Sequence, residues 1–187
     1  QILAAVTAVT LAVVAGVALS AQAGGGFSKS SCTFNGKKLA GVAPYKVARL
    51  GMVRTFQINQ LYSDLSPLET VLIAINEREN AATSWFKPLG SRSDLVDEAA
   101  ALLVRLNLAD VMQARVGSLA YGRQRLLEMA IALASRPQVL LLDEPAAGVP
   151  EGERDQILDV VAALPADVSL ILIEHDMDLV FRFAKTL

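Results

Sequence analysis

The sequence predicts an α/β fold in which a mainly parallel sheet is flanked by helices. Two uninterrupted aliphatic runs, residues 139–142 and 170–173, are typical of strands buried on both faces of a parallel sheet. Amphipathic segments precede and separate these runs, so helix and strand alternate along the second half of the chain. This alternation predicts helices layered against the sheet.

Composition supports one packed domain and excludes several classes of protein. The 187 residues are 53% hydrophobic and 19% charged, which argues against disorder, collagen or a coiled coil. The single cysteine, Cys32, excludes an internal disulfide scaffold. The net charge of −2 predicts no nucleic-acid partner. Residues 1–63 carry six basic side chains and no acid, so a polyanion would bind there, although a solvated surface explains the same pattern.

The first 28 residues contain no charged side chain and allow two interpretations. Residues 2–23 are apolar and long enough to cross a bilayer, and AQA at 21–23 resembles a signal-peptidase site. A signal peptide also needs a positive region before the apolar stretch, and this chain has none. Alternating Val and Thr followed by Gly16 favour two short buried strands joined by a turn.

The remaining elements follow from periodicity and turn residues. GGGFSKSS at 24–31 has no period and predicts a loop, and Asn35-Gly36 predicts a hairpin turn. Apolar residues at helical spacing predict one helix over 95–106 and a second that includes 126–133. Proline at 137 stops the second helix, and a third, over 153–164, ends at Pro165.

Polar side chains capable of chemistry follow both buried strands. Asp143 and Glu144 come after the first strand, and Glu174, His175 and Asp176 come after the second. Ligands of open parallel sheets bind beyond the carboxyl ends of the strands, so these side chains are expected at one edge. Charged residues also follow strands that simply enter water, and that plainer interpretation stays open.

An aliphatic strand that ends in Asp-Glu suits Mg²⁺-assisted hydrolysis of a nucleotide. One carboxylate would hold the metal while the other activates a water. The phosphate loop of such a site would be residues 23–30, AGGGFSKS, which has the length of the G-x-x-x-x-G-K-[ST] pattern. The loop keeps Lys29 and Ser30, but Ala23 and Ser28 replace its two defining glycines.

Four ordered motifs carry a family resemblance: RTFQ at 54–57, LAYGRQR at 119–125, VLLLDEPAAG at 139–148 and IEHDMDLV at 173–180. Together they resemble the ATP-binding subunits of ABC transporters, most closely those of branched-chain amino acid importers. The resemblance implies a P-loop NTPase-like fold, α/β with a small α-helical subdomain. It divides the chain into residues 1–77, the first part of the nucleotide-binding core, 78–118, the helical subdomain that leads into the signature segment, and 119–187, the rest of the core.

The resemblance also implies a role for each matching residue, with ATP and Mg²⁺ as cofactors. The catalytic group contains Glu144 as general base, His175 as the switch histidine and Gln57 as the Q-loop glutamine. The metal would be held by Ser30, Gln57 and Asp143. The nucleotide would contact Gly24, Gly25, Gly26, Ser28, Lys29, Ser30 and Ser31 of one subunit and Leu119, Ala120, Tyr121 and Gly122 of the signature segment of another.

This arrangement implies a dimer with a second ATP-binding subunit, identical or related, and transmembrane permease subunits as partners. The expected place is the cytoplasmic face of a bacterial inner membrane, as a peripheral subunit that is not secreted. The expected function is ATP hydrolysis that drives import of branched-chain amino acids or similar small polar solutes.

The sequence departs from the family pattern near the phosphate loop. Only residues 31–33 stand where relatives have a full helix, and the chain is expected to begin inside the family's first strands and to end before its last. A catalytically impaired subunit with a structural or partner role is therefore an alternative. A second alternative is a metal-dependent hydrolase that uses Asp143, Glu144, His175 and Asp176 without nucleotide.

Overall fold

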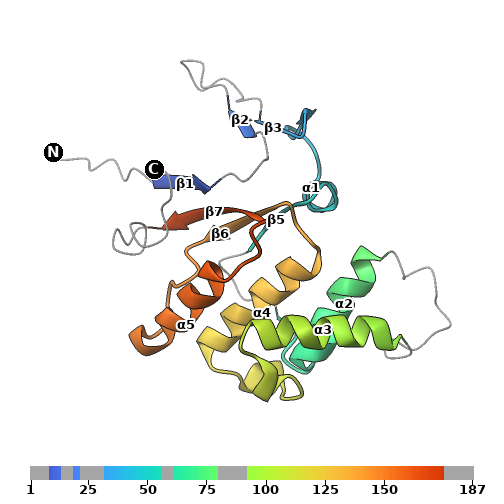
Figure 1. Cartoon of the computed structure of the whole chain (residues 1–187), viewed down its shortest axis with the longest axis vertical. Coiled ribbons are helices and arrows are strands. Elements are labelled where there is room, and N and C mark those ends of the chain that lie inside the picture. Colours follow the sequence, from blue (N-terminus) through green and yellow to red (C-terminus); the bar gives the residue numbers. More distant parts are fainter. Residues whose placement is uncertain (1–8, 14–18, 22–31, 56–60, 80–91, 175–187) are drawn as a thin grey trace.

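The computed structural model describes residues 9–13, 19–21, 32–55, 61–79 and 92–174 (Figure 1). A four-stranded sheet has the order β1 (Val9–Val13), β7 (Ser169–Glu174), β6 (Val139–Asp143) and β5 (Met52–Arg54). Strands β5, β6 and β7 are parallel, whereas β1 runs antiparallel to β7. The mainly parallel sheet and both predicted buried strands are thus confirmed.

A second, three-stranded antiparallel sheet contains β2 (Leu19–Ala21), β3 (Cys32–Phe34) and β4 (Lys37–Lys38). The predicted turn at Asn35-Gly36 joins β3 to β4, with φ of 48° and 75° at the two residues, as a tight hairpin turn requires. Asn35 Nδ2 donates a hydrogen bond to Gln138 Oε1 at 2.9 Å, which ties this hairpin to the residue that precedes β6.

The apolar N-terminal region contributes strands rather than a helix where it is described. Both β1 and β2 fall within the stretch that is long enough to cross a bilayer. In the described part of the chain, no helix has the length and apolar character that a membrane span needs. The interpretation as short strands is confirmed for these two segments, and the turn expected at Gly16 lies outside the described residues.

Five α-helices accompany the strands in the described ranges. They are α1 (Pro44–Arg49), α2 (Pro67–Arg78), α3 (Ser93–Arg105), α4 (Tyr121–Ala134) and α5 (Glu151–Ala162). The predicted helices match α3, α4 and α5, with ends displaced by one to a few residues, whereas α1 and α2 were not predicted. Figure 1 shows α2 to α5 gathered on one side of the four-stranded sheet.

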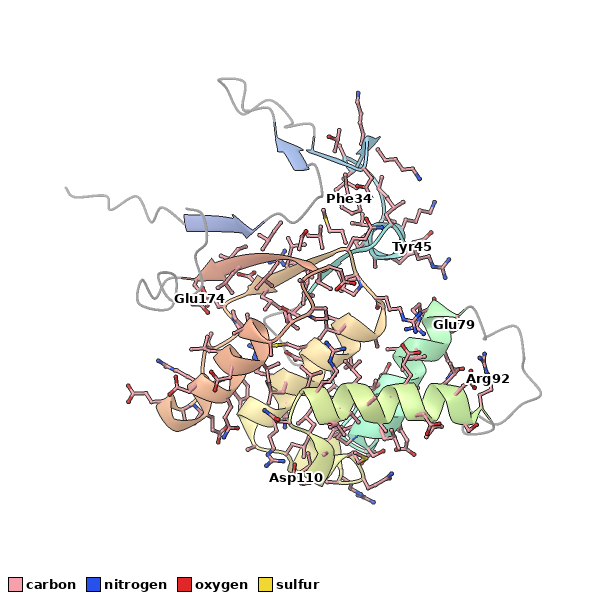
Figure 2. The ribbon with its side chains drawn as sticks, viewed as in Figure 1. Phe34, Tyr45, Glu79, Arg92, Asp110 and Glu174 are labelled. Atoms are coloured by element: carbon pink, nitrogen blue, oxygen red, sulfur yellow. The ribbon has the colours of Figure 1, made fainter. Side chains whose placement is uncertain are left out.

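Alternate residues of β6 and β7 serve two separate hydrophobic clusters, as strand geometry dictates. Leu140, Leu142 and Leu172 pack into the large cluster formed with α2 to α5, which includes Leu103 at 0% exposure. Val139 and Ile171 point to the other face, where Phe34 of β3 covers them. Both faces of the central strands are therefore buried, which leaves their ends for polar chemistry. Figure 2 shows Phe34 on the side of the four-stranded sheet that faces away from the helices, and Glu174 at the end of β7.

Candidate functional site

Asp143 closes strand β6 and is held there by an arginine from the neighbouring strand. Arg54, the last residue of β5, donates from Nη2 to Asp143 Oδ2 at 2.5 Å. The Asp143 side chain is 12% exposed, whereas the Arg54 side chain is 58% exposed. Because β5 and β6 are parallel, both residues lie at the carboxyl edge of the sheet, where α/β proteins bind ligands.

Glu144 follows in a left-handed backbone conformation, with φ of 47°. Its N–H donates to the carbonyl of Ile173 in β7 at 2.9 Å, and its carbonyl accepts from the Ala147 N–H at 3.0 Å. The parallel register pairs Asp143 with Ile173, so β6 and β7 end side by side. A non-glycine residue in this conformation is strained, and such strain is frequent at functional sites.

A buried ion pair lies beside Asp143. Arg125 of α4 donates from Nη1 to Glu128 Oε2 at 2.8 Å, and both side chains are almost covered, at 6% and 11% exposure. A small pocket is lined by both residues together with Thr55 and Asp143. Desolvation by burial raises the pKa of Glu128, while the hydrogen bond and charge of Arg125 oppose that rise. Sequence reasoning gave neither residue a role.

The expected signature residues Leu119, Ala120, Tyr121 and Gly122 lie at the start of α4. Ala120 is the N-cap residue and has no side-chain oxygen with which to bond the first helical amides. Glu153 of α5 supplies that group instead, because its Oε2 accepts from the Gly122 N–H at 3.2 Å. Leu119 is buried, and Tyr121 is 38% exposed with the Arg125 guanidinium 5.3 Å from its ring centre. The segment adjoins Gly148, where an added Cβ would lie 3.4 Å from the Tyr121 ring.

The other predicted site residues lie outside the described part of the chain, and their roles stay predictions. They are the glycine-rich loop residues Gly24, Gly25, Gly26, Ser28, Lys29, Ser30 and Ser31, together with Gln57 and His175. Strand β3 already begins at Cys32, so described residues 32 and 33 are strand rather than helix. Glu174 is the last residue of β7 and is buried, whereas the sequence placed it just beyond the strand.

The carboxylates of Asp143 and Glu144 suit Mg²⁺, which is usually bound by few protein groups together with a substrate phosphate. They do not suit a metal ion that needs a full set of protein ligands. Mg²⁺ usually takes one or two carboxylates together with phosphate oxygens and waters, and Asp143 with Glu144 offers such oxygens. Among the described residues, no three His, Cys, Asp or Glu side chains group in a way that could hold a metal ion. Two residues of the nucleotide-free metallohydrolase alternative, His175 and Asp176, lie outside the described residues, so that alternative stays a prediction.

Comparison with known proteins identifies the class to which this fold and site belong. A family model described as "ABC transporter" matches residues 21–147, more than half of the chain. Two solved ATP-binding cassettes of ABC transporters, one in its ADP conformation and one nucleotide-free, superpose with TM-scores of 0.67 and 0.66 at 28% identity. Each match covers 83% of this chain and 63% of the solved chain. The chain belongs to the ABC transporter family, as an ATP-binding cassette with the expected P-loop NTPase-like fold.

Within that family, similar curated relatives include high-affinity branched-chain amino acid transport ATP-binding proteins. BraF of Pseudomonas aeruginosa is 39% identical over 157 residues, which cover 80% of this chain and 62% of BraF. LivG of Escherichia coli K12 is 35% identical over 151 residues, which cover 76% of this chain and 58% of LivG. The chain is thus related to the ATP-binding subunits of branched-chain amino acid transporters, and it spans about three-fifths of their length.

Proposed function

We propose that this chain binds and hydrolyses ATP as a subunit of an ABC importer for branched-chain amino acids or similar small polar solutes. The observation that carries the proposal is the placement of Asp143 and Glu144 at the carboxyl end of β6, in a chain related to BraF and LivG. Both carboxylates lie where a parallel sheet presents groups to a ligand.

Asp143 would hold Mg²⁺ together with Ser30 and Gln57. Arg54 balances the charge of Asp143 in this structure. Because the Arg54 side chain is 58% exposed, it can turn into solvent at little cost and leave Asp143 to the metal. Bound Mg²⁺ would neutralise phosphate charge and orient the terminal phosphate.

Glu144 would accept a proton from the attacking water. Its N–H is fixed to the Ile173 carbonyl, so the position of the base depends on β7 as well as on β6. His175 follows β7 directly and would contact the γ-phosphate. Lys29 and the loop glycines would hold the other phosphates, since a lysine and backbone amides are the groups that such loops offer.

The signature segment would act on a nucleotide held by a second subunit. The start of α4 carries backbone amides, of which the Gly122 N–H donates to Glu153 in this structure, and helix N-termini attract anions. An identical or related ATP-binding subunit and transmembrane permease subunits are the proposed partners. The assembly would place the chain as a peripheral subunit at the cytoplasmic face of a bacterial inner membrane.

Titration with MgATP and a turnover assay test the proposal. We expect saturable binding, loss of binding in Lys29→Ala, and a turnover at least about 100-fold lower in Glu144→Gln, since general bases contribute roughly that much or more. Glu151→Gln, an exposed acid in the first turn of α5, is the matched control and should leave turnover unchanged. No MgATP binding by a chain shown to be folded by circular dichroism would refute the proposal, and binding without turnover would favour a catalytically impaired subunit.

A further inference from the structure

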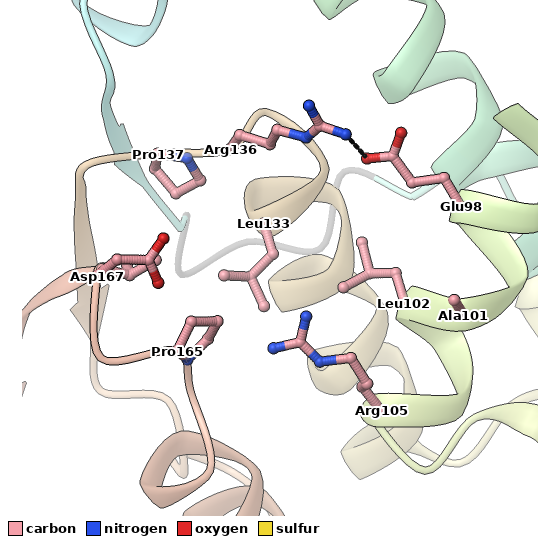
Figure 3. Close-up of a pocket in the computed structure, with 10 residues that line it drawn as sticks. Glu98, Ala101, Leu102, Arg105, Leu133, Arg136, Pro137, Pro165 and Asp167 are labelled. Carbon is pink, nitrogen blue, oxygen red and sulfur yellow. Dashed lines mark hydrogen bonds and ion pairs between the residues drawn. The ribbon is translucent and has the colours of Figure 1, made fainter. Parts of the chain in front are cut away.

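A second cleft lies at the opposite edge of the sheet from Asp143. Its volume is about 390 Å³, and it is bounded by α3, the end of α4 and the turn between α5 and β7 (Figure 3). Pro137 and Val168, which precede the first residues of β6 and β7, form part of its wall. The volume falls within the range of small-molecule sites, roughly 300–1,000 Å³. We call it the α3–α4 cleft.

Two opposite charges face the α3–α4 cleft without meeting each other. Arg105, at the end of α3, and Asp167, in the turn before β7, both line it. Figure 3 shows the guanidinium and the carboxylate on opposite sides of the hollow, with Leu133 between them. Within the described ranges, neither side chain has an ion pair or a hydrogen-bond partner. Both residues are exposed to solvent, and a ligand that carries both charges would pair with both of them at once.

The remaining charges at the cleft favour a ligand with no net charge. Arg136 donates from Nη2 to Glu98 Oε1 at 3.0 Å, and Arg78 bonds both oxygens of the same carboxylate at 2.8 and 2.9 Å. The carboxylates of Glu98 and Asp167 would repel phosphate or another polyanion. The lining arginines Arg105 and Arg136 equal these acids in number, so the walls are neutral in sum.

The floor of the cleft is aliphatic. Leu102 and Leu133 are only partly buried and lie between the charged groups, and Pro165 adds a further apolar surface. Arg105 and Asp167 are exposed, so a wholly apolar ligand would gain nothing from their charges. A zwitterion with an aliphatic side chain matches both the charges and the floor.

We propose that the α3–α4 cleft binds a free aliphatic α-amino acid. The carboxylate of the ligand bonds Arg105, its ammonium group bonds Asp167, and its side chain packs on Leu133 and Pro165. This site is separate from the nucleotide site and does not depend on the proposed function. If that function holds, the cleft gives an accumulated solute direct contact with α4, the helix that begins with the signature segment.

Calorimetric titration of the full chain with L-leucine, without nucleotide, tests the proposal. We expect saturable binding of L-leucine and at least about tenfold weaker binding of three analogues. These are 4-methylpentanoate, which lacks the ammonium group, 3-methylbutylamine, which lacks the carboxylate, and glycine, which lacks the side chain. The series needs no variant, so a folding defect cannot imitate the result.

Variants then locate the site. Arg105→Gln and Asp167→Asn should each weaken L-leucine binding by at least about tenfold. Arg115→Gln and Asp97→Asn alter exposed side chains of the same types outside the cleft and should have no effect. The proposal is overturned if the folded chain shows no saturable L-leucine binding up to about 10 mM, if 4-methylpentanoate binds as well, or if neither cleft variant changes the affinity. MgATP titration is a separate measurement, so either proposal can fail alone.

Discussion

Replacing Gly122 with alanine would test whether Glu153 holds the start of α4. A Cβ on Gly122 would lie 2.3 Å from Glu153 Oε2, far closer than real atoms approach, and 3.3 Å from Glu153 Cβ. The nearest atom lies at the end of the flexible Glu153 side chain, so the carboxylate would move away while the helix stays in place. That movement breaks the 3.2 Å hydrogen bond to the Gly122 N–H.

The expected magnitude comes from two opposing effects. Loss of a capping hydrogen bond at a helix start costs about 1 kcal/mol, and loss of the favourable contact between an anion and that helix end costs about 0.5 kcal/mol more. Alanine regains up to about 1 kcal/mol over glycine through its helix propensity. Gly122→Ala should therefore destabilise the chain by about 0.5–1 kcal/mol. In a Glu153→Ala background this hydrogen bond is already absent, so Gly122→Ala should stabilise the folded chain by a similar amount.

Urea denaturation of the four chains in this double-mutant cycle measures the coupling. Gly152→Ala is the matched control, because Gly152 is also the second residue of its helix and an added Cβ meets nothing within 4 Å. That control should be neutral or stabilising. If Gly122→Ala destabilises equally with and without the Glu153 carboxylate, the capping argument is refuted.

Three further predictions concern the core, the buried Arg125–Glu128 pair and the partly exposed Glu98 carboxylate. Leu103→Ala should cost about 2–5 kcal/mol because Leu103 is fully buried, whereas Val104→Ala, at a 55% exposed neighbour, should cost under about 0.5 kcal/mol in the same urea titration. Arg125→Met and Glu128→Leu should each cost about 3 kcal/mol by leaving one buried charge, and the double variant should cost less than either; equal or greater loss in the double variant would contradict this. The hydrogen bond from Arg78 lowers the pKa of Glu98. The ionised Glu98 carboxylate therefore stabilises the fold fully above the ordinary pKa of 4.5, and this stabilisation is lost as pH falls through the lowered pKa. The stability difference between wild type and Glu98→Gln, about 1 kcal/mol at pH 7, should therefore shrink on acidification below 4.5, and a pH-independent difference would contradict the assignment.

Local pattern predicted the central strands and three of the helices because their signals lie within single segments. The aliphatic runs of β6 and β7 indicate strands that are covered on both faces, and the spacing of apolar residues in α3 indicates a helix that is covered on one face. Helix α2 also has a local start signal in the sequence. Ser66 and Glu69 form a capping box around Pro67 at the first helical position, a start signal that the letters SPLE at 66–69 already contain.

The supporting contacts of the site could not be predicted in the same way. Arg54 and Asp143 are 89 residues apart, and Gly122 and Glu153 are 31 apart. Neither contact leaves a periodicity in the sequence, because each depends on which strands and helices become neighbours. The family motifs indicated Asp143 and Glu144, whereas their physical partners emerged only from the folded arrangement.

At Glu144, the left-handed backbone conformation lowers stability, whereas the side chain is the one that we propose as the base. An L side chain with φ of 47° costs about 1 kcal/mol relative to glycine, which adopts that geometry freely. Glycine there would relieve the strain of the turn, but it would delete the carboxylate that we propose as the base. A carboxylate placed here for the proposed hydrolysis therefore carries a cost in backbone strain.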